Sequence, residues 1–151
     1  MILEEWESFA PESFDIIVSL HTLEHVPRPF PILEGLAARL VSGGTLFFVV
    51  PNVGGLGHRL KGKQWFAYRD PTHTSLLSQG QWVTLVRRAG LKVVSVHGDG
   101  MWDPPYVRRI PAGLQRVVFG APAAVQVFWP FSRPFLPAVL GECLIVTARK
   151  R

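Results

Sequence analysis

The chain has 151 residues, of which 48% are hydrophobic and 18% are charged, so it is long enough to form one domain with a core of its own. Its single cysteine, Cys143, excludes an internal disulfide framework and a cysteine-based zinc site. The N-terminus does not combine a basic flank with an apolar signal core, so we expect one cytoplasmic domain spanning residues 1–151.

The charges are unevenly distributed along the chain. Residues 1–34 contain seven acids and one base, whereas residues 35–151 contain fifteen bases and four acids, a net charge of 15 − 4 = +11. Such an excess attracts an anionic partner, which can be a phosphorylated substrate, a nucleic acid or an anionic membrane surface. A solvated basic face without a partner is the other explanation.

Two short apolar runs predict buried strands. Residues 14–20 (FDIIVSL) and 45–50 (TLFFVV) are rich in β-branched and aromatic residues without alternation, which is typical of parallel strands covered on both faces. Between them, apolar residues at helical spacing follow Pro29 and Pro31 and precede a glycine pair, so we predict a helix over residues 30–41. Together the three segments form a strand-helix-strand crossover.

The later elements are predicted by their end signals. Ser78 and Gln81 form a capping box, and Gly90 ends the apolar stripe that follows it, so a second helix lies between them. Strands are predicted at 91–97 (LKVVSVH) and 143–150 (CLIVTARK). The chain therefore alternates strands and helices, as α/β proteins do.

A segment rich in proline and aromatic residues, 103–138, interrupts this pattern with seven of the thirteen prolines. Its longest uncharged run, 117–132, contains Pro122 and Pro130 and is shorter than the ~18–20 apolar residues of a membrane-spanning helix. Three roles remain open for the segment. It can form an apolar lid, an interfacial segment in peripheral membrane contact with its arginines at headgroup level, or irregular packing on the sheet edge.

A polar cluster follows the first predicted strand. His21, Glu24 and His25 stand at i, i+3 and i+4, so a single helical turn would place all three on one face. The carboxyl ends of parallel strands are where open α/β sheets bind their ligands. The cluster can therefore hold an ion, perform acid-base chemistry, or serve only as a polar network that shapes the loop.

Five phrases of the chain point to a family: ESFDIIVSLHTLEHVPRP, LVSGGTLFFVVPN, YRDPTHTSLLS, LVRRAGLKVVSV and ECLIVTARK. In this order and spacing they resemble the C-terminal half of the class I S-adenosylmethionine-dependent methyltransferases, in the branch that includes ubiquinone-biosynthesis O-methyltransferases. The resemblance covers residues 12–101 and 141–150. It implies a partial Rossmann-like fold with parallel strands, covering helices and a closing antiparallel strand. It also implies O-methylation of a small-molecule or lipid-like acceptor with S-adenosylmethionine as cofactor.

The family's N-terminal half, with its glycine-rich cofactor turn, has no counterpart in the chain. The run VGGLGHRL at 53–60 lacks the third glycine and an acid about 20 residues further on, so we expect a flexible basic loop there. Two hypotheses follow: an enzyme that is inactive as this chain alone, or a non-catalytic methyltransferase-like binding module. An unpaired edge at strand 14–20 would favour a homo-oligomer.

The resemblance also assigns roles to the polar cluster. Ser19, Leu20 and His21 match the positions that line the methionine end of the cofactor. Some O-methyltransferases of this class hold a divalent ion with a Glu-x-x-Glu-His cluster and a downstream histidine. The matching residues here are His21, Glu24, His25 and His73.

The imidazole at the first of these positions makes the set better suited to zinc, iron or manganese than to magnesium. Without a metal, His25 or His73 would be the catalytic base, since the reference pKa of histidine is about 6.5.

The acceptor is expected to lie beyond the strand at 45–50. Asn52 ends this strand and either faces the ligand or caps the next loop. Residues 35–69 contain no acid, and the basic and aromatic residues there are expected to grip an anionic acceptor. They are Arg59, Lys61, Lys63 and Trp65. The composition also suits nucleic-acid stacking, which we consider the weaker alternative.

Overall fold

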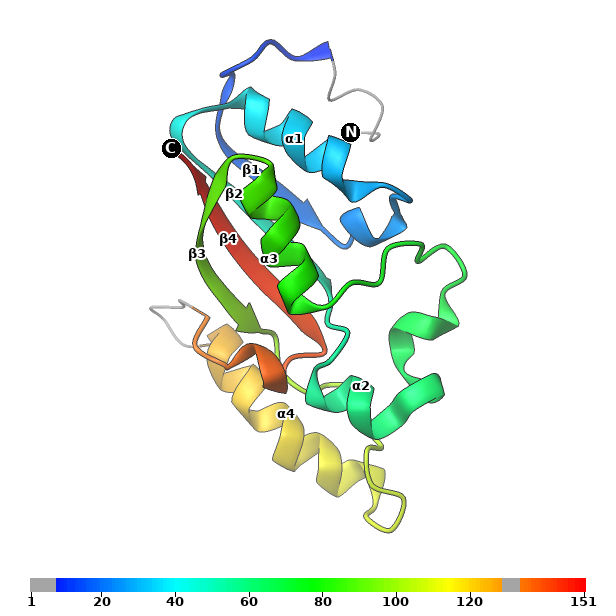
Figure 1. The fold of residues 1–151 in the computed structure, drawn as a ribbon. Helices are drawn as coiled ribbons and strands as arrows, with labels where there is room; N and C mark the ends of the chain where they lie inside the picture. Colours follow the sequence, from blue (N-terminus) through cyan, green and yellow to red (C-terminus); the bar gives the residue numbers. More distant parts are fainter. Residues whose placement is uncertain (1–7, 129–133) are drawn as a thin grey trace.

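The structure of the protein, a computed structural model, describes residues 8–128 and 134–151. Its centre is a four-stranded sheet in the order β1-β2-β4-β3 (Figure 1). The strands are β1 (Phe14–Leu20), β2 (Leu40–Pro51), β3 (Leu91–Gly98) and β4 (Cys143–Lys150). β1 is parallel to β2, whereas β4 runs antiparallel to both of its neighbours. The predicted parallel pair and the closing antiparallel strand are confirmed.

Two helices pack side by side on one face of this sheet (Figure 1). They are α1 (Pro29–Arg39) and α3 (Gln79–Arg88), close to the predicted ranges. Between helices and sheet, Leu33, Phe48, Trp82 and Val146 are fully buried. Burial of each such side chain stabilises the fold by about 1.5–3 kcal/mol, so this layer is the core.

The predicted capping box begins α3. The Ser78 backbone N–H donates to Gln81 Oε1 at 2.8 Å, and the Gln81 backbone N–H donates to Ser78 Oγ at 3.4 Å. At the other end, Gly90 has a φ of +84°, a conformation that glycine adopts without strain. The helix therefore begins and ends as its sequence predicts.

The opposite face of the sheet is open. Ile16, Val18 and Leu20 are 65%, 57% and 57% exposed, because both described helices that pack on the sheet lie on its other side. The expectation that strand 14–20 is covered on both faces is therefore wrong for the described residues. Apolar periodicity alone does not tell which face of a strand a helix will cover.

The segment 53–69 is not the expected flexible loop. It forms α2 (Leu56–Lys61) and two 3₁₀ turns, Gly62–Gln64 and Phe66–Arg69. Gly57 lies so close to the Glu142 carboxylate that a Cβ atom would overlap it, and Trp65 is fully buried. These contacts with residues remote in sequence order the segment.

The sequence of the proline-rich segment 103–138 leaves a lid, an interfacial segment and irregular packing open. In the structure this segment contains a 17-residue helix, α4 (Ala112–Phe128). Pro122 lies inside this helix. Residues 129–133 of the segment lie outside the described residues. Within the ranges that the structure describes, no helix is both long and apolar enough to cross a membrane.

Candidate functional site

The loop after β1 is held in place by backbone hydrogen bonds. The His21 N–H donates to Val49 O on the neighbouring strand at 3.0 Å. A 3₁₀ turn then spans Leu23–His25, and the Thr74 and Ser75 N–H groups both donate to Glu24 O, at 2.9 and 2.8 Å. The loop that carries His73 is thus tied to the turn that carries His25.

Glu24, His25 and His73 form a compact cluster at this place. Each offers one ligand atom, and these atoms all lie within 4.8 Å of one another. The Glu24 side chain is fully buried, and its Oε2 has no hydrogen-bond partner within the described part of the chain. Since an unpaired buried carboxylate oxygen costs free energy, this atom points to a ligand.

Hydrogen bonds define which imidazole nitrogens of the cluster carry protons. His73 Nδ1 lies 2.8 Å from the carbonyl of Ala67, so this nitrogen is the donor. The Thr72 hydroxyl donates to Asp70 Oδ1 at 2.6 Å, so it accepts from His25 Nδ1 at 2.8 Å. In the neutral form of each ring, Nε2 is therefore the nitrogen with the free lone pair that a metal ligand or a catalytic base requires. Asp70 Oδ2 also lies 3.8 Å from His73 Nε2.

The fourth expected metal ligand, His21, lies outside this group. Its Nδ1 is 3.2 Å from Glu24 Oε1, and this hydrogen bond raises the pKa of His21 above its usual 6.5. His21 has a φ of +48° and precedes the 3₁₀ turn, so the helical spacing that would align residues 21, 24 and 25 does not apply. The structure therefore assembles three of the four expected ligands.

The expected cofactor residues lie at the same strand end. Ser19 and Leu20 pair with Phe48 and Val49 in the last rungs of the parallel ladder, and His21 follows them. The Leu20 side chain is more than half exposed on the open face of the sheet. The three residues thus border the cluster from the side of β1.

The five expected acceptor residues are not brought to one surface. Asn52 is buried, and its Nδ2 donates to the carbonyls of Ala138 and Gly141 at 2.7 and 3.0 Å, which ties the end of β2 to the turn before β4. Asn52 and Arg59 line one hollow of about 240 Å³. Arg59 and Lys63 are exposed. Lys61 and Trp65 belong to an internal polar network.

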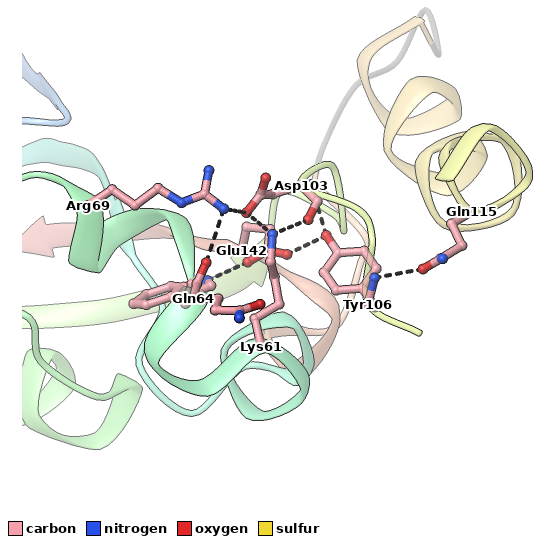
Figure 2. Close-up of polar contacts among 8 residues, drawn as sticks. Lys61, Gln64, Arg69, Asp103, Tyr106, Gln115 and Glu142 are labelled. Carbon is pink, nitrogen blue, oxygen red and sulfur yellow. Dashed lines mark hydrogen bonds and ion pairs between the residues drawn. The ribbon is translucent and has the colours of Figure 1, made fainter. Parts of the chain in front are cut away.

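Figure 2 shows this network, which joins α2, the segment before α4 and the start of β4. Lys61 Nζ donates to Asp103 O at 2.6 Å and pairs with the Asp103 carboxylate. Glu142 accepts from Trp65 Nε1 at 2.5 Å and from the Tyr106 hydroxyl. Burial raises the pKa of Glu142, and burial together with the Glu142 hydrogen bond raises the pKa of Tyr106.

Sequence reasoning missed Glu142, Tyr106 and Asp103. One signal was available for Glu142, because it is the only acid after Asp103 and directly precedes an apolar strand. An isolated acid in such a place needs buried partners.

An apolar groove of about 770 Å³ lies between two segments that follow the cluster residues in the sequence. It is formed by residues 27–31, which follow the 3₁₀ turn, and by residues 74–85, which follow His73. Phe30, Leu77 and Leu85 are among its lining side chains. Its apolar lining suits an apolar molecule, and Glu24, His25 and His73 are not among the lining residues.

Solved structures identify the fold. A SAM-dependent methyltransferase from Archaeoglobus fulgidus aligns with 98% of this chain and 64% of its own, with a TM-score of 0.60 and 16% identity. A Thermotoga maritima SAM-dependent methyltransferase, described as a possible histamine N-methyltransferase, aligns with 95% of this chain and 59% of its own, with a TM-score of 0.60 and 18% identity. The fold is the predicted methyltransferase fold, and the chain spans about 60% of these structures.

Sequence comparison gives the family. The methyltransferase domain family matches residues 3–96, and the chain belongs to this family. The ubiquinone biosynthesis O-methyltransferase of Stutzerimonas stutzeri (strain A1501) is 42% identical over 43 residues, which are 28% of this chain and 18% of that protein. The protein of that name from Xanthomonas campestris pv. campestris (strain B100) is 40% identical over 50 residues, 33% and 21% of the two chains. The matched part is thus about a fifth of these relatives.

Proposed function

We propose that the protein takes part in methyl transfer from S-adenosylmethionine to a hydroxyl oxygen of a small-molecule or lipid-like acceptor. One observation carries this proposal. In a chain of the methyltransferase domain family, Glu24, His25 and His73 converge at the carboxyl end of β1, the edge at which open α/β sheets bind ligands. The names of the ubiquinone-biosynthesis relatives support oxygen as the methylated atom.

The residues of the chain have two tasks in this reaction. The cofactor supplies a methyl group that its sulfonium already activates. Ser19, Leu20 and His21 would line the methionine end, while the acceptor would lie with its hydroxyl near the imidazoles of the cluster. Nε2 of His25 or His73 would accept the proton that the acceptor hydroxyl loses when its oxygen takes the methyl group.

The cluster also fits a divalent ion. One carboxylate and two imidazoles suit zinc, iron or manganese better than magnesium, and the unpaired Glu24 Oε2 favours a ligand at this place. A bound ion would lower the pKa of the acceptor hydroxyl.

Cofactor binding is tested by calorimetry with S-adenosylhomocysteine. We expect micromolar affinity, and the affinity should fall when Leu20, which borders the proposed cofactor site, is replaced by Lys. Leu60→Lys, at an exposed leucine of α2 outside the proposed cofactor site, is the matched control. Absence of binding would favour the alternative function, a non-catalytic binding module. One sequence feature favours that alternative: the 151 residues contain no glycine-rich strand-turn followed by the ribose-binding acid.

Metal binding is tested separately by titration with Co²⁺, whose visible absorption reports its ligands. Glu24→Gln and His73→Ala should each weaken binding at least tenfold. His97→Ala, a histidine of β3 outside the cluster, should leave binding unchanged. Equal binding by all variants would exclude this cluster as the metal site.

A further inference from the structure

Helix α4 buries polar side chains and exposes apolar ones, which is the reverse of an ordinary surface helix. Its two glutamines, Gln115 and Gln126, are 1% and 6% exposed, whereas Val117, Val127 and Phe128 are 68%, 70% and 83% exposed. Leu114, Val118 and Val125 are also more than half exposed. A soluble surface helix normally turns its apolar side chains inward, so this outer face calls for an explanation.

Hydrogen bonds fix the helix in this orientation. Gln115 Oε1 accepts from the N–H groups of Tyr106 and Val107 at 2.6 and 3.0 Å, and the first of these contacts is drawn in Figure 2. Gln126 donates to Gly98 O at 3.0 Å and accepts from the N–H of Leu136 at 2.8 Å. Rotation of α4 to bury its valines would break these buried hydrogen bonds, so the outer face stays apolar.

The charged residues of α4 and of the segments that flank it in the sequence, 104–141, are all basic. No acid lies between Asp103 and Glu142, whereas Arg108, Arg109 and Arg116 are exposed. Arg108 and Arg109 also line a hollow of about 780 Å³ that reaches Ala112, the first residue of α4. The positive end of the helix dipole lies there as well, so this end of α4 favours anions.

These features favour one kind of binding partner for the apolar face of α4. An apolar helix face bordered by arginines is the composition that lies in the interface of an anionic bilayer, where valines enter the acyl boundary and arginines reach the phosphates. With 17 residues, α4 is roughly 25 Å long and can lie flat on such a surface. A second copy of the chain would instead place these arginines against like charges, since the segment has no acid to pair with them.

We propose that α4 and the arginines at its N-terminal end form a binding surface for the interface of an anionic lipid bilayer. Figure 1 shows α4 beyond the ends of β2 and β3, the sheet end at which the Glu24–His25–His73 cluster also lies. Binding through α4 would therefore turn this end of the sheet toward the lipid. The inference does not depend on methyl transfer, and its test uses neither cofactor nor acceptor.

The first test measures partition of the protein onto vesicles of phosphatidylcholine with phosphatidylglycerol, by co-sedimentation. Because each valine or phenylalanine gains about 1.5–3 kcal/mol on full burial, Val117→Gln with Phe128→Gln should weaken partition at least tenfold. The matched control is Leu60→Gln with Val94→Gln, two apolar side chains that are 46% and 59% exposed on α2 and β3. The control should bind as the parent does, and circular dichroism should show equal helix content in all variants.

The second test addresses charge. Arg108→Gln with Arg109→Gln should weaken partition onto anionic vesicles by roughly 25-fold, since each basic side chain near such a surface contributes about 1 kcal/mol. Arg87→Gln with Lys92→Gln removes two exposed charges elsewhere and should have little effect. On vesicles of pure phosphatidylcholine, the variant with Arg108→Gln and Arg109→Gln should partition as the parent does.

Two outcomes would overturn the inference. One is failure of either lipid test. Partition of the α4 variants would then be unchanged, or the parent would bind neutral and anionic vesicles equally tightly. The other is a sedimentation experiment in which the α4 variants lose self-association while vesicle binding stays as it was. The face would then be a contact between copies of the chain.

Discussion

At the scale of single residues, His21 is the titratable side chain of the site with a raised pKa. Its hydrogen bond to Glu24 favours the charged imidazole in the folded protein. The stabilisation is complete below the unfolded pKa of 6.5 and is lost as the pH rises through the higher folded value. His21 should therefore contribute more to the free energy of unfolding at mildly acidic than at alkaline pH.

The His21→Asn substitution tests this pH dependence, because asparagine tolerates the positive φ and does not titrate. At about pH 5.5 it should lower the free energy of unfolding by about 0.2–1 kcal/mol, a surface-like value since the side chain is 52% exposed. At about pH 9 the loss should be close to zero. In a Glu24→Gln background, His21→Asn should change the free energy of unfolding equally at both pH values. If the effect still depends on pH, a group other than Glu24 causes that dependence.

Tyr106 allows a second prediction at this scale. Its hydroxyl donates to Glu142 and accepts from the Asp103 N–H at 2.9 Å, in a buried setting. Tyr106→Phe leaves a carboxylate oxygen and an amide without this partner, so the free energy of unfolding in urea should fall by about 1–3 kcal/mol. Tyr68→Phe removes a hydroxyl from a half-exposed ring and should cost less than about 0.5 kcal/mol. Equal losses would mean that the network contributes little.

The residues of the site differ in how far the sequence predicts them. Glu24 and His25 stand out by their position after a strand, and His73 by the family resemblance alone. Glu142 could not be placed in the same way, since its partners Trp65 and Tyr106 lie 77 and 36 residues away. Pairings over such distances are set by tertiary packing, which local spacing does not encode.

At the scale of elements, Gly57 couples α2 to β4. A Cβ atom at this position would overlap the Glu142 carboxylate, which Trp65 and Tyr106 hold in place. Gly57→Ala should therefore destabilise the protein by about 1–3 kcal/mol through overpacking, despite the higher helix propensity of alanine. In thermal unfolding this appears as a lower melting temperature.

Gly80 in α3 is the matched control for Gly57. Nothing lies within 4 Å of a Cβ atom there, so Gly80→Ala should stabilise the helix by about 0.5–1 kcal/mol. An increase in melting temperature for both variants would show that Glu142 moves away at no cost.

The elements themselves were predictable where their ends carry local signals. The capping box and Gly90 bound α3, and the apolar run of residues 14–20 coincides with β1. The sequence does not predict helix α4, because its buried residues are glutamines and because it contains Pro122, a residue type that usually ends a helix. Hydrophobic periodicity finds helices that pack their apolar side inward, and α4 does the reverse.

At the scale of the whole molecule, the sheet has helices on one face and an open edge at β1. Among the described strands β1 pairs only with β2, so its outer edge leaves backbone donors and acceptors unpaired. The exposed side chains of Ile16, Val18 and Leu20 lie beside this edge. Such an edge is a template for another strand, and we expect the chain to self-associate through it.

Val18→Lys should weaken this association, because a charged side chain on an edge strand opposes pairing with a second strand. In sedimentation equilibrium the dissociation constant of the oligomer should rise at least tenfold, while the circular dichroism spectrum stays unchanged. Thr84→Lys adds the same charge on the exposed surface of α3 and should leave the dissociation constant as it is. A parent chain that stays monomeric at every concentration, or equal effects of the two lysines, would mean that β1 is not the contact. Because α4 lies beyond the end of the sheet, its variants should not change this equilibrium, which separates association through β1 from binding to lipid.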